Sequence, residues 1–199
     1  VYMMERRYER AVDYSIKSLD YNRTNLNAYQ VMCAAYRKSG QFKKAEQVIQ
    51  EIREIDPLSH FARYETFLLK QNRRNLDDFQ SMVRCEYREE TYLELALFYC
   101  RIGLEEECAR ILDLVSDYPT ACYWLAYVWR HKDPEKSRSY LDKASSLPPD
   151  LVFPFREESI KVFQWAASIR PDDWKAKYYL SLIYWSKARV KASLALLKD

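Results

Sequence analysis

The fold is decided by residues 25–57, which read NLNAYQVMCAAYRKSGQFKKAEQVIQEIREIDP. Large apolar residues recur at the three- and four-residue spacing of a helix on both sides of Gly40. The small residues Cys33 and Ala45 fall where two antiparallel helices would approach each other most closely. Pro57 ends the second helix, because proline cannot donate the helical hydrogen bond. This stretch therefore predicts a hairpin of two antiparallel helices joined by a tight turn at Gly40.

The same spacing recurs along the chain. It starts again at Tyr92, at Leu125 and at Leu180, and Ala11 matches a second helix whose first helix is missing. The segment 58–84 is degenerate but keeps helical periodicity. Asp133 and Asn75 stand where they can cap helices. The sequence predicts twelve helices, near residues 3–20, 26–39, 42–55, 59–70, 75–84, 88–102, 104–117, 119–131, 134–146, 155–169, 172–187 and 189–198.

The repeating unit resembles the tetratricopeptide repeat, a pair of antiparallel helices about 34 residues long. The resemblance implies an all-α fold, a right-handed α-α superhelix of about five to six helix pairs. Each repeat in such an array contacts mainly its neighbours. We therefore expect residues 1–199 to form a single solenoid that belongs to a longer chain, with an irregular proline-rich break at 146–155.

Composition supports this prediction. Only 2 of the 199 residues are glycine, which excludes sheet folds and glycine-cradled nucleotide sites, because both need glycine in their turns. The net charge is +3 with mixed signs, so we expect no nucleic-acid partner. There is no run of 18 apolar residues, and we expect no membrane span.

Cysteine and histidine form no recognisable site. The five cysteines contain no CxxC pair, and the two histidines, His60 and His131, are far apart. We expect buried, unpaired thiols, no metal and no cofactor, and unpaired thiols favour a cytoplasmic location. Glu157 and Glu158 are no acid–base pair, since adjacent helical residues point about 100° apart. The sequence therefore predicts no catalytic residues.

The proline-rich segment interrupts the helical rhythm. Residues 146–155 read SLPPDLVFPF and hold three prolines, so this stretch cannot be a helix interior. Its apolar residues Leu151, Val152, Phe153 and Phe155 either pack over the solenoid or form a contact with another domain or ligand.

The C-terminal third resembles something more particular. The runs VFPFREESI (residues 152–160) and WKAKYYLSLIYW (residues 174–185) are similar to the helical half of large bacterial proteins. In those proteins, tetratricopeptide repeats follow an uncharacterised β-rich domain found near carbohydrate-use functions. This resemblance implies that the chain is an excised repeat region, and it brings no catalytic residue to any position.

Tetratricopeptide arrays bind peptides or protein domains in a groove lined by their first helices. The resemblance places one polar, basic group and one mostly aromatic group of residues in that groove. Aromatic residues beside a cation are suited to holding an extended peptide or to stacking on a sugar ring. The alternative is that these aromatic residues are ordinary packing between helices. The predicted groove residues are Arg37, Lys38, Tyr123, Tyr127, Arg130, Tyr178, Leu182 and Trp185.

Three classes of function can be weighed on the sequence. The first is a non-enzymatic interaction scaffold that binds a protein or a peptide. The second is an accessory helical domain that supports a carbohydrate-related enzyme domain elsewhere in the parent chain. The third, an enzyme in its own right, has no supporting constellation. We also expect self-association through the exposed ends, where Leu194, Leu196 and Leu197 lack a following repeat.

Overall fold

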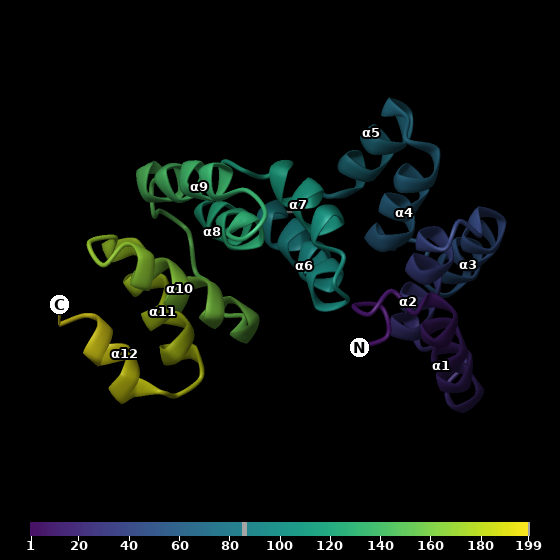
Figure 1. Cartoon of the computed structure of the whole chain (residues 1–199), viewed down its shortest axis with the longest axis horizontal. Coiled ribbons are helices and arrows are strands. Elements are labelled where there is room, and N and C mark those ends of the chain that lie inside the picture. The colour runs from purple at the N-terminus through teal and green to yellow at the C-terminus, as the bar shows by residue number, and fades with distance from the viewer. Residues whose placement is uncertain (85–86, 199) are drawn as a thin grey trace. The chain divides into compact units, whose positions relative to one another are not determined.

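A computed structural model describes residues 1–84 and 87–198 (Figure 1). Over these residues the protein is all-α and has no strand, with its helices in sequential pairs, and the predicted tetratricopeptide-like fold class is confirmed. The helices are α1 (Tyr8–Tyr21), α2 (Leu26–Lys38), α3 (Phe42–Ile55), α4 (His60–Lys70), α5 (Arg73–Met82), α6 (Arg88–Arg101), α7 (Glu105–Asp113), α8 (Pro119–Trp129), α9 (Pro134–Ser146), the 3-10 helix η1 (Glu157–Ser159), α10 (Ile160–Ile169), α11 (Trp174–Ser186) and α12 (Val190–Leu196).

One turn geometry joins helices at several places. A residue in the left-handed region ends the first helix, and the amide of the following residue donates to a carbonyl five residues back. In the pair α2–α3 the left-handed residue is Gly40, and Gln41 N donates to Tyr36 O at 2.9 Å. The same geometry occurs at Ala188, where Arg189 N donates to Tyr184 O at 2.8 Å. The same turn geometry occurs at Arg6 and at Gly103, whose φ angles are 58° and 81°.

Small residues lie where paired helices meet, as the sequence predicts. In the pair α2–α3, Cys33 and Ala45 are fully buried, and the Cys33 thiol lies 3.7 Å from the carbonyl oxygen of Ala45. In the pair α11–α12, the Ser193 hydroxyl donates to the carbonyl of Ser181 at 2.9 Å. Any larger side chain at these positions would push the two helix backbones apart.

Helix boundaries match the predicted ones except at a few ends. The first helix begins at Tyr8 rather than near residue 3, because the left-handed Arg6 separates a short helical turn from α1. The tenth begins at Ile160, five residues later than predicted, because residues 152–156 have no regular secondary structure and η1 follows them. Asp133 caps α9 as expected by accepting from Lys136 N at 3.0 Å. Asn75 is no cap, since Asn72 takes that role in α5.

Contacts divide the chain into two compact units. Unit 1 consists of Val1–Thr91 and Phe98–Leu104, and unit 2 of Tyr92–Leu97 and Glu105–Asp199. Aromatic rings fill the core of each. In unit 1 the rings of Phe61 and Tyr64 both pack on that of Tyr99, at 5.9 and 5.7 Å between centroids. The organisation of residues 1–199 as one solenoid remains a prediction.

The cysteines differ from the expectation of unpaired thiols. Cys33 and Cys122 are free and buried as expected, and Cys85 lies outside the described residues. Cys100 and Cys108 each take part in a disulfide bond, so the expectation of unpaired thiols was wrong for these two. A cytoplasmic location was expected only because the thiols were expected to be unpaired, and it loses that support.

Candidate partner-binding surfaces

The predicted basic part of the groove contains a buried ion pair. The Arg37 guanidinium on α2 donates to both carboxylate oxygens of Glu65 on α4, at 2.7 and 3.2 Å, and the Tyr99 hydroxyl on α6 donates to Glu65 at 2.8 Å. The Glu65 side chain is fully buried and that of Arg37 is 10% exposed. Burial, together with the Glu65 charge, raises the pKa of Tyr99. Glu65 therefore joins α4 to α2 and to the C-terminal part of α6. Lys38, beside Arg37, is half-buried.

The structure corrects the prediction that Tyr123 faces a groove. Its ring is fully buried against Phe163 and Tyr179, and its hydroxyl donates to Asp173 at 2.6 Å. Asp173 caps α11 and also accepts from the Ser145 hydroxyl at 2.8 Å. Burial and the hydrogen bond to Asp173 raise the pKa of Tyr123. Tyr123 therefore packs α8 against α11, as in the alternative that the sequence left open.

The next two predicted residues, Tyr127 on α8 and Arg130 directly after this helix, lie at the surface and contact each other. Tyr127 and Arg130 are half-buried, and the Arg130 guanidinium lies 3.6 Å from the centroid of the Tyr127 ring. The Arg130 guanidinium also donates a hydrogen bond to the backbone carbonyl of Tyr127. From α10, the Trp165 ring meets Tyr127 edge-on at 5.5 Å, and the Lys161 ammonium lies 5.8 Å from the same ring. We call Tyr127, Arg130, Lys161 and Trp165 the aromatic–cation cluster.

The predicted residues on α11 line a different part of unit 2. Tyr178, Leu182 and Trp185 share one helix face by their four- and three-residue spacing. Tyr178 and Leu182 are half-buried, whereas Trp185 is 60% exposed. Tyr178 also lines a cavity of about 260 Å³ between the start of α11 and the end of α12. The other residues of this cavity are Pro171, Asp172, Trp174, Lys177, Leu196 and Leu197.

The proline-rich segment presents alternate side chains to solvent. Val152 and Pro154 are buried, whereas Leu151, Phe153 and Phe155 are 67%, 60% and 49% exposed. The alternation occurs in a stretch without regular secondary structure, which Leu151 begins in the left-handed region with a φ of 58°. Val152 and Pro154 therefore pack on the rest of unit 2, as in the first interpretation of the segment, whereas its contact with another domain or a ligand stays a prediction.

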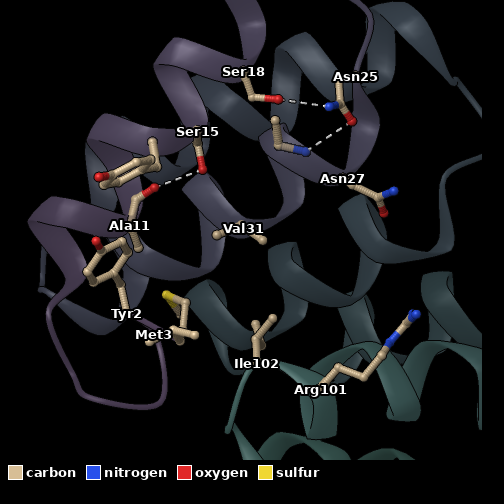
Figure 2. Close-up of a pocket in the computed structure, with 13 residues that line it drawn as sticks. Tyr2, Met3, Ala11, Ser15, Ser18, Asn25, Asn27, Val31, Arg101 and Ile102 are labelled. Atoms are coloured by element: carbon tan, nitrogen blue, oxygen red, sulfur yellow. Dashed lines mark hydrogen bonds between the residues drawn. The ribbon is translucent and has the colours of Figure 1, made fainter. Parts of the chain in front are cut away.

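A larger cavity, of about 340 Å³, lies within unit 1 (Figure 2). Figure 2 shows Ser18 and Asn25 at one end and Tyr2 and Met3 at the other, with Val31 between them. The Asn25 amide donates to the Ser18 hydroxyl at 3.0 Å, which closes the first end. Tyr2 is stacked on Tyr14 at 5.0 Å, centroid to centroid. The remaining lining residues are Val1, Ala11, Ser15, Asn27, Ala28, Arg101 and Ile102.

Metal sites and membrane-spanning helices are both absent from the described part of the chain. Within residues 1–84 and 87–198, no three of the His, Cys, Asp and Glu side chains are grouped so that they could hold a metal ion. Over the same residues, no helix combines the length and apolar character needed to cross a membrane.

Comparison with known proteins supports the repeat assignment. Residues 2–68 match the model of the tetratricopeptide repeat family. Domains of this family are usually non-catalytic. A comparison of the sequence with curated proteins gives no match.

Several solved structures are similar to this chain. YrrB, described as a TPR protein with an unusual peptide-binding site, is 13% identical over 92% of this chain and 89% of its own, with a TM-score of 0.34. MamA is 16% identical, over 99% of this chain and 82% of its own, with a TM-score of 0.30. A chain of the APC/C hetero-tetramer Cut9–Hcn1 is 11% identical, over 100% of this chain and 45% of its own, with a TM-score of 0.40.

Sequence reasoning missed half of the aromatic–cation cluster. Lys161 and Trp165 lie on α10, which the repeat pattern assigns to the second helices, outside the predicted groove. Their four-residue spacing places them on one face of that helix and was a usable signal. Packing of α10 on α8 then brings them to Tyr127.

Proposed function

We propose that this chain is a non-enzymatic interaction scaffold, and that its aromatic–cation cluster binds an acidic peptide segment of a partner protein. The observation that carries the proposal is the placement of two cations, Arg130 and Lys161, over one half-buried ring, Tyr127. Aromatic and arginine side chains commonly dominate binding energy at protein interfaces. Tyr127 and Trp165 would contact an apolar side chain of the peptide, and the cations its carboxylates.

The charge of the two helices favours an acidic ligand. Neither α8 nor α10 contains an Asp or Glu residue. Arg130 follows the last residue of α8 and Lys161 is on α10, so these helices contribute only positive charge at the cluster. A positive surface attracts acidic segments and speeds their association, and this effect weakens with salt. Leu182 and Trp185 on α11, and Tyr178 beside its cavity, are candidates for further contacts, as are Arg37 and Lys38 in unit 1.

Selection from a displayed library of random peptides tests this proposal. We expect the selected peptides to be enriched in Asp and Glu beside an aromatic or aliphatic residue. Tyr127→Ala and Arg130→Gln should each weaken binding about tenfold or more, with helicity unchanged. Trp185→Ala should weaken binding to the same extent if the ligand extends to α11. Binding should also fall as salt is raised.

A matched control is available in unit 1. Tyr21 is 93% exposed at the end of α1, so Tyr21→Ala removes an exposed tyrosine far in sequence from the cluster. This variant should bind the selected peptides as the unchanged chain does. Peptides without acidic residues, or equal binding by Tyr127→Ala and the control, would refute the cluster as the binding site.

A second candidate function is an accessory domain that docks on another domain of the parent protein. The uncovered side of the proline-rich segment favours it, since Leu151, Phe153 and Phe155 expose apolar surface together. The resemblance of the C-terminal third to bacterial proteins with a carbohydrate-related β-rich domain suggests the partner. Phe153→Ser with Phe155→Ser should then abolish docking to the remainder of the parent chain, measured by co-purification, and leave peptide binding intact.

A further inference from the structure

The turn between α1 and α2 carries a motif that the function proposed above does not use. Residues 22–24 read Asn-Arg-Thr, which is the acceptor pattern for Asn-linked glycosylation: an asparagine, any residue except proline, and a serine or threonine. Among the asparagines of this chain, only Asn22 has a serine or threonine two positions later. Such a short pattern also arises by chance, so the structure around it has to decide whether it can be modified.

The motif lies at the surface and outside a helix. Residues 20–24 are all exposed, and Tyr21 has 93% of its surface accessible. Asn22 is the C-cap of α1, with an extended φ of −142° and ψ of 99°. Side chains two residues apart on a helix point about 200° apart, so a helical motif could not present both to one enzyme. At this turn the Asn22 and Thr24 side chains instead contact each other.

Thr24 holds the Asn22 side chain in one orientation. Asn22 Oδ1 accepts from the Thr24 backbone amide at 3.1 Å and from the Thr24 hydroxyl at 3.0 Å. A backbone amide can only donate, so the atom that faces Thr24 is the oxygen, and Nδ2 lies at the other corner of the planar amide. Within the described part of the chain, Nδ2 donates no hydrogen bond. This nitrogen is therefore accessible to a reactant that arrives from solvent.

Further hydrogen bonds hold the turn itself. Asn22 N donates to Ser18 O at 3.0 Å, and Asn25 N donates to Asn22 O at 3.1 Å. The Asn25 side-chain amide also donates to the Ser18 hydroxyl at 3.0 Å, as Figure 2 shows, and its Oδ1 caps α2. A turn that is already ordered loses little conformational entropy when an enzyme binds it.

These contacts suit the chemistry of amide glycosylation. An amide nitrogen is a weak nucleophile, because its lone pair is delocalised into the carbonyl group. When Nδ2 loses a proton, negative charge develops on Oδ1, and both Thr24 donors are already directed at that atom. Donors placed in advance where charge develops stabilise the reacting state.

The cysteines agree with a modification of this kind. Cys100 and Cys108 each take part in a disulfide bond. Disulfides form and persist in oxidising compartments, such as the endoplasmic reticulum lumen, the bacterial periplasm and the cell exterior. Acceptor asparagines in surface loops are a feature of secreted proteins. The disulfide-bonded cysteines and the motif therefore indicate the same route through the cell.

We propose that Asn22 is an N-glycosylation site and that Thr24 is its positioning residue. A transferase moves a sugar from a glycosyl diphosphate to Asn22. The bond from the sugar C1 to the diphosphate oxygen breaks, and a bond from C1 to Nδ2 forms. The diphosphate leaves with the electron pair, and one Nδ2 proton passes to a base of the transferase. The bulky, hydrated glycan covers the α1–α2 turn. This site belongs to unit 1 and does not depend on peptide binding at the aromatic–cation cluster.

Mass spectrometry of the full chain, purified from the cells that produce it naturally, tests the proposal. We expect the intact mass to include a glycan. An amidase that releases Asn-linked glycans should remove this mass and leave aspartate at position 22, located by peptide sequencing. Two extracts of the same cells then identify the donor. The unmodified chain is incubated with membranes and a lipid-linked glycosyl diphosphate, or with soluble extract and a nucleotide-linked one.

Variants separate the role of Thr24 from exposure alone. Asn22→Gln should abolish the modification. Thr24→Val keeps the side-chain size and the backbone amide but removes the hydroxyl, so the rate of transfer should fall about a hundredfold or more. Thr24→Ser restores a hydroxyl and should restore transfer. The matched control is Asn27→Gln, which replaces an exposed asparagine outside the motif and should leave the glycan in place. Circular dichroism should show the same helicity in all four variants.

Three results would overturn the proposal. The first is a naturally produced chain without sugar on Asn22. The second is failure of both extracts to modify the unmodified chain. The third is equal transfer to Thr24→Val and to the unchanged chain, which would remove the role of Thr24. Peptide binding at the aromatic–cation cluster is measured separately, and none of these outcomes decides it.

Discussion

Removal of Arg37 should destabilise unit 1 severely. Arg37→Met keeps most of the side-chain length but leaves the fully buried Glu65 carboxylate without the guanidinium that neutralises it. Breaking a buried ion pair by removing one partner typically costs about 3–5 kcal/mol. Since about 1.4 kcal/mol corresponds to a factor of ten, local opening should become more frequent by roughly two to three and a half orders of magnitude.

Hydrogen exchange read by mass spectrometry locates this loss. Amides of α2 and α4, which the ion pair joins, should exchange faster by that factor, and urea unfolding followed by far-UV circular dichroism should begin at lower urea. Lys70→Met is the matched control, because Lys70 pairs with Glu46 at the surface with both side chains about half exposed. Surface pairs contribute about 0–1 kcal/mol, so this variant should remain close to the unchanged chain.

The double variant Arg37→Met with Glu65→Leu separates the charge effect from packing. Apolar replacement of both partners should recover most of the lost stability, because no uncompensated charge remains buried. Destabilisation by Arg37→Met of less than about 1 kcal/mol would refute the reasoning. A double variant as unstable as the sum of its single variants would refute it as well.

Three further predictions concern turns, helix contacts and pH. Gly103→Ala should destabilise the protein more than Gly40→Ala. Both positions have a positive φ, so an alanine at either one costs roughly 1–2 kcal/mol of stability. A Cβ at Gly103 would also lie 2.8 Å from Met4 Cγ, whereas a Cβ at Gly40 would have nothing within 4 Å. Equal melting temperatures for the two variants would contradict this. Ala45→Leu and Ala126→Leu should each cost on the order of 1–3 kcal/mol by overpacking fully buried helix contacts, measured by thermal denaturation; melts like that of the unchanged chain would show the repeat register to be wrong. Burial raises the pKa of Cys122 from 9.0 to about 11. Between these pH values the folded state therefore keeps a thiol proton that the unfolded state loses. The free energy of unfolding should fall between pH 9 and 11 by up to about 3 kcal/mol. Urea midpoints across this range should fall less in Cys122→Ala, and an equal fall would refute the assignment.

Local sequence was sufficient for the helices and their pairing. Apolar periodicity located the twelve α-helices of the described residues, because a helix that buries one face must repeat its apolar residues every three or four positions. Cys33 and Ala45 were identified as contact residues for the same reason, since only small side chains allow two backbones to come close. The first helix was misplaced at its start because its break depends on a left-handed arginine, a conformation that only glycine and asparagine signal in sequence.

Tertiary structure alone decided which predicted surface residues are available. Tyr123 and Tyr127 occupy equivalent faces of α8, four residues apart, yet Tyr123 is buried by α11 and its capping Asp173, whereas Tyr127 remains at the surface. Arg37 likewise forms an ion pair with Glu65, which lies on the next helix pair and 28 residues away in sequence. Spacing along one helix determines which side chains share a face, but which of them a neighbouring helix then covers depends on contacts distant in sequence. Such contacts form only when the helix pairs pack together. The repeat pattern therefore determined where the helices lie in the sequence, and the packing of the pairs determined which side chains remain exposed.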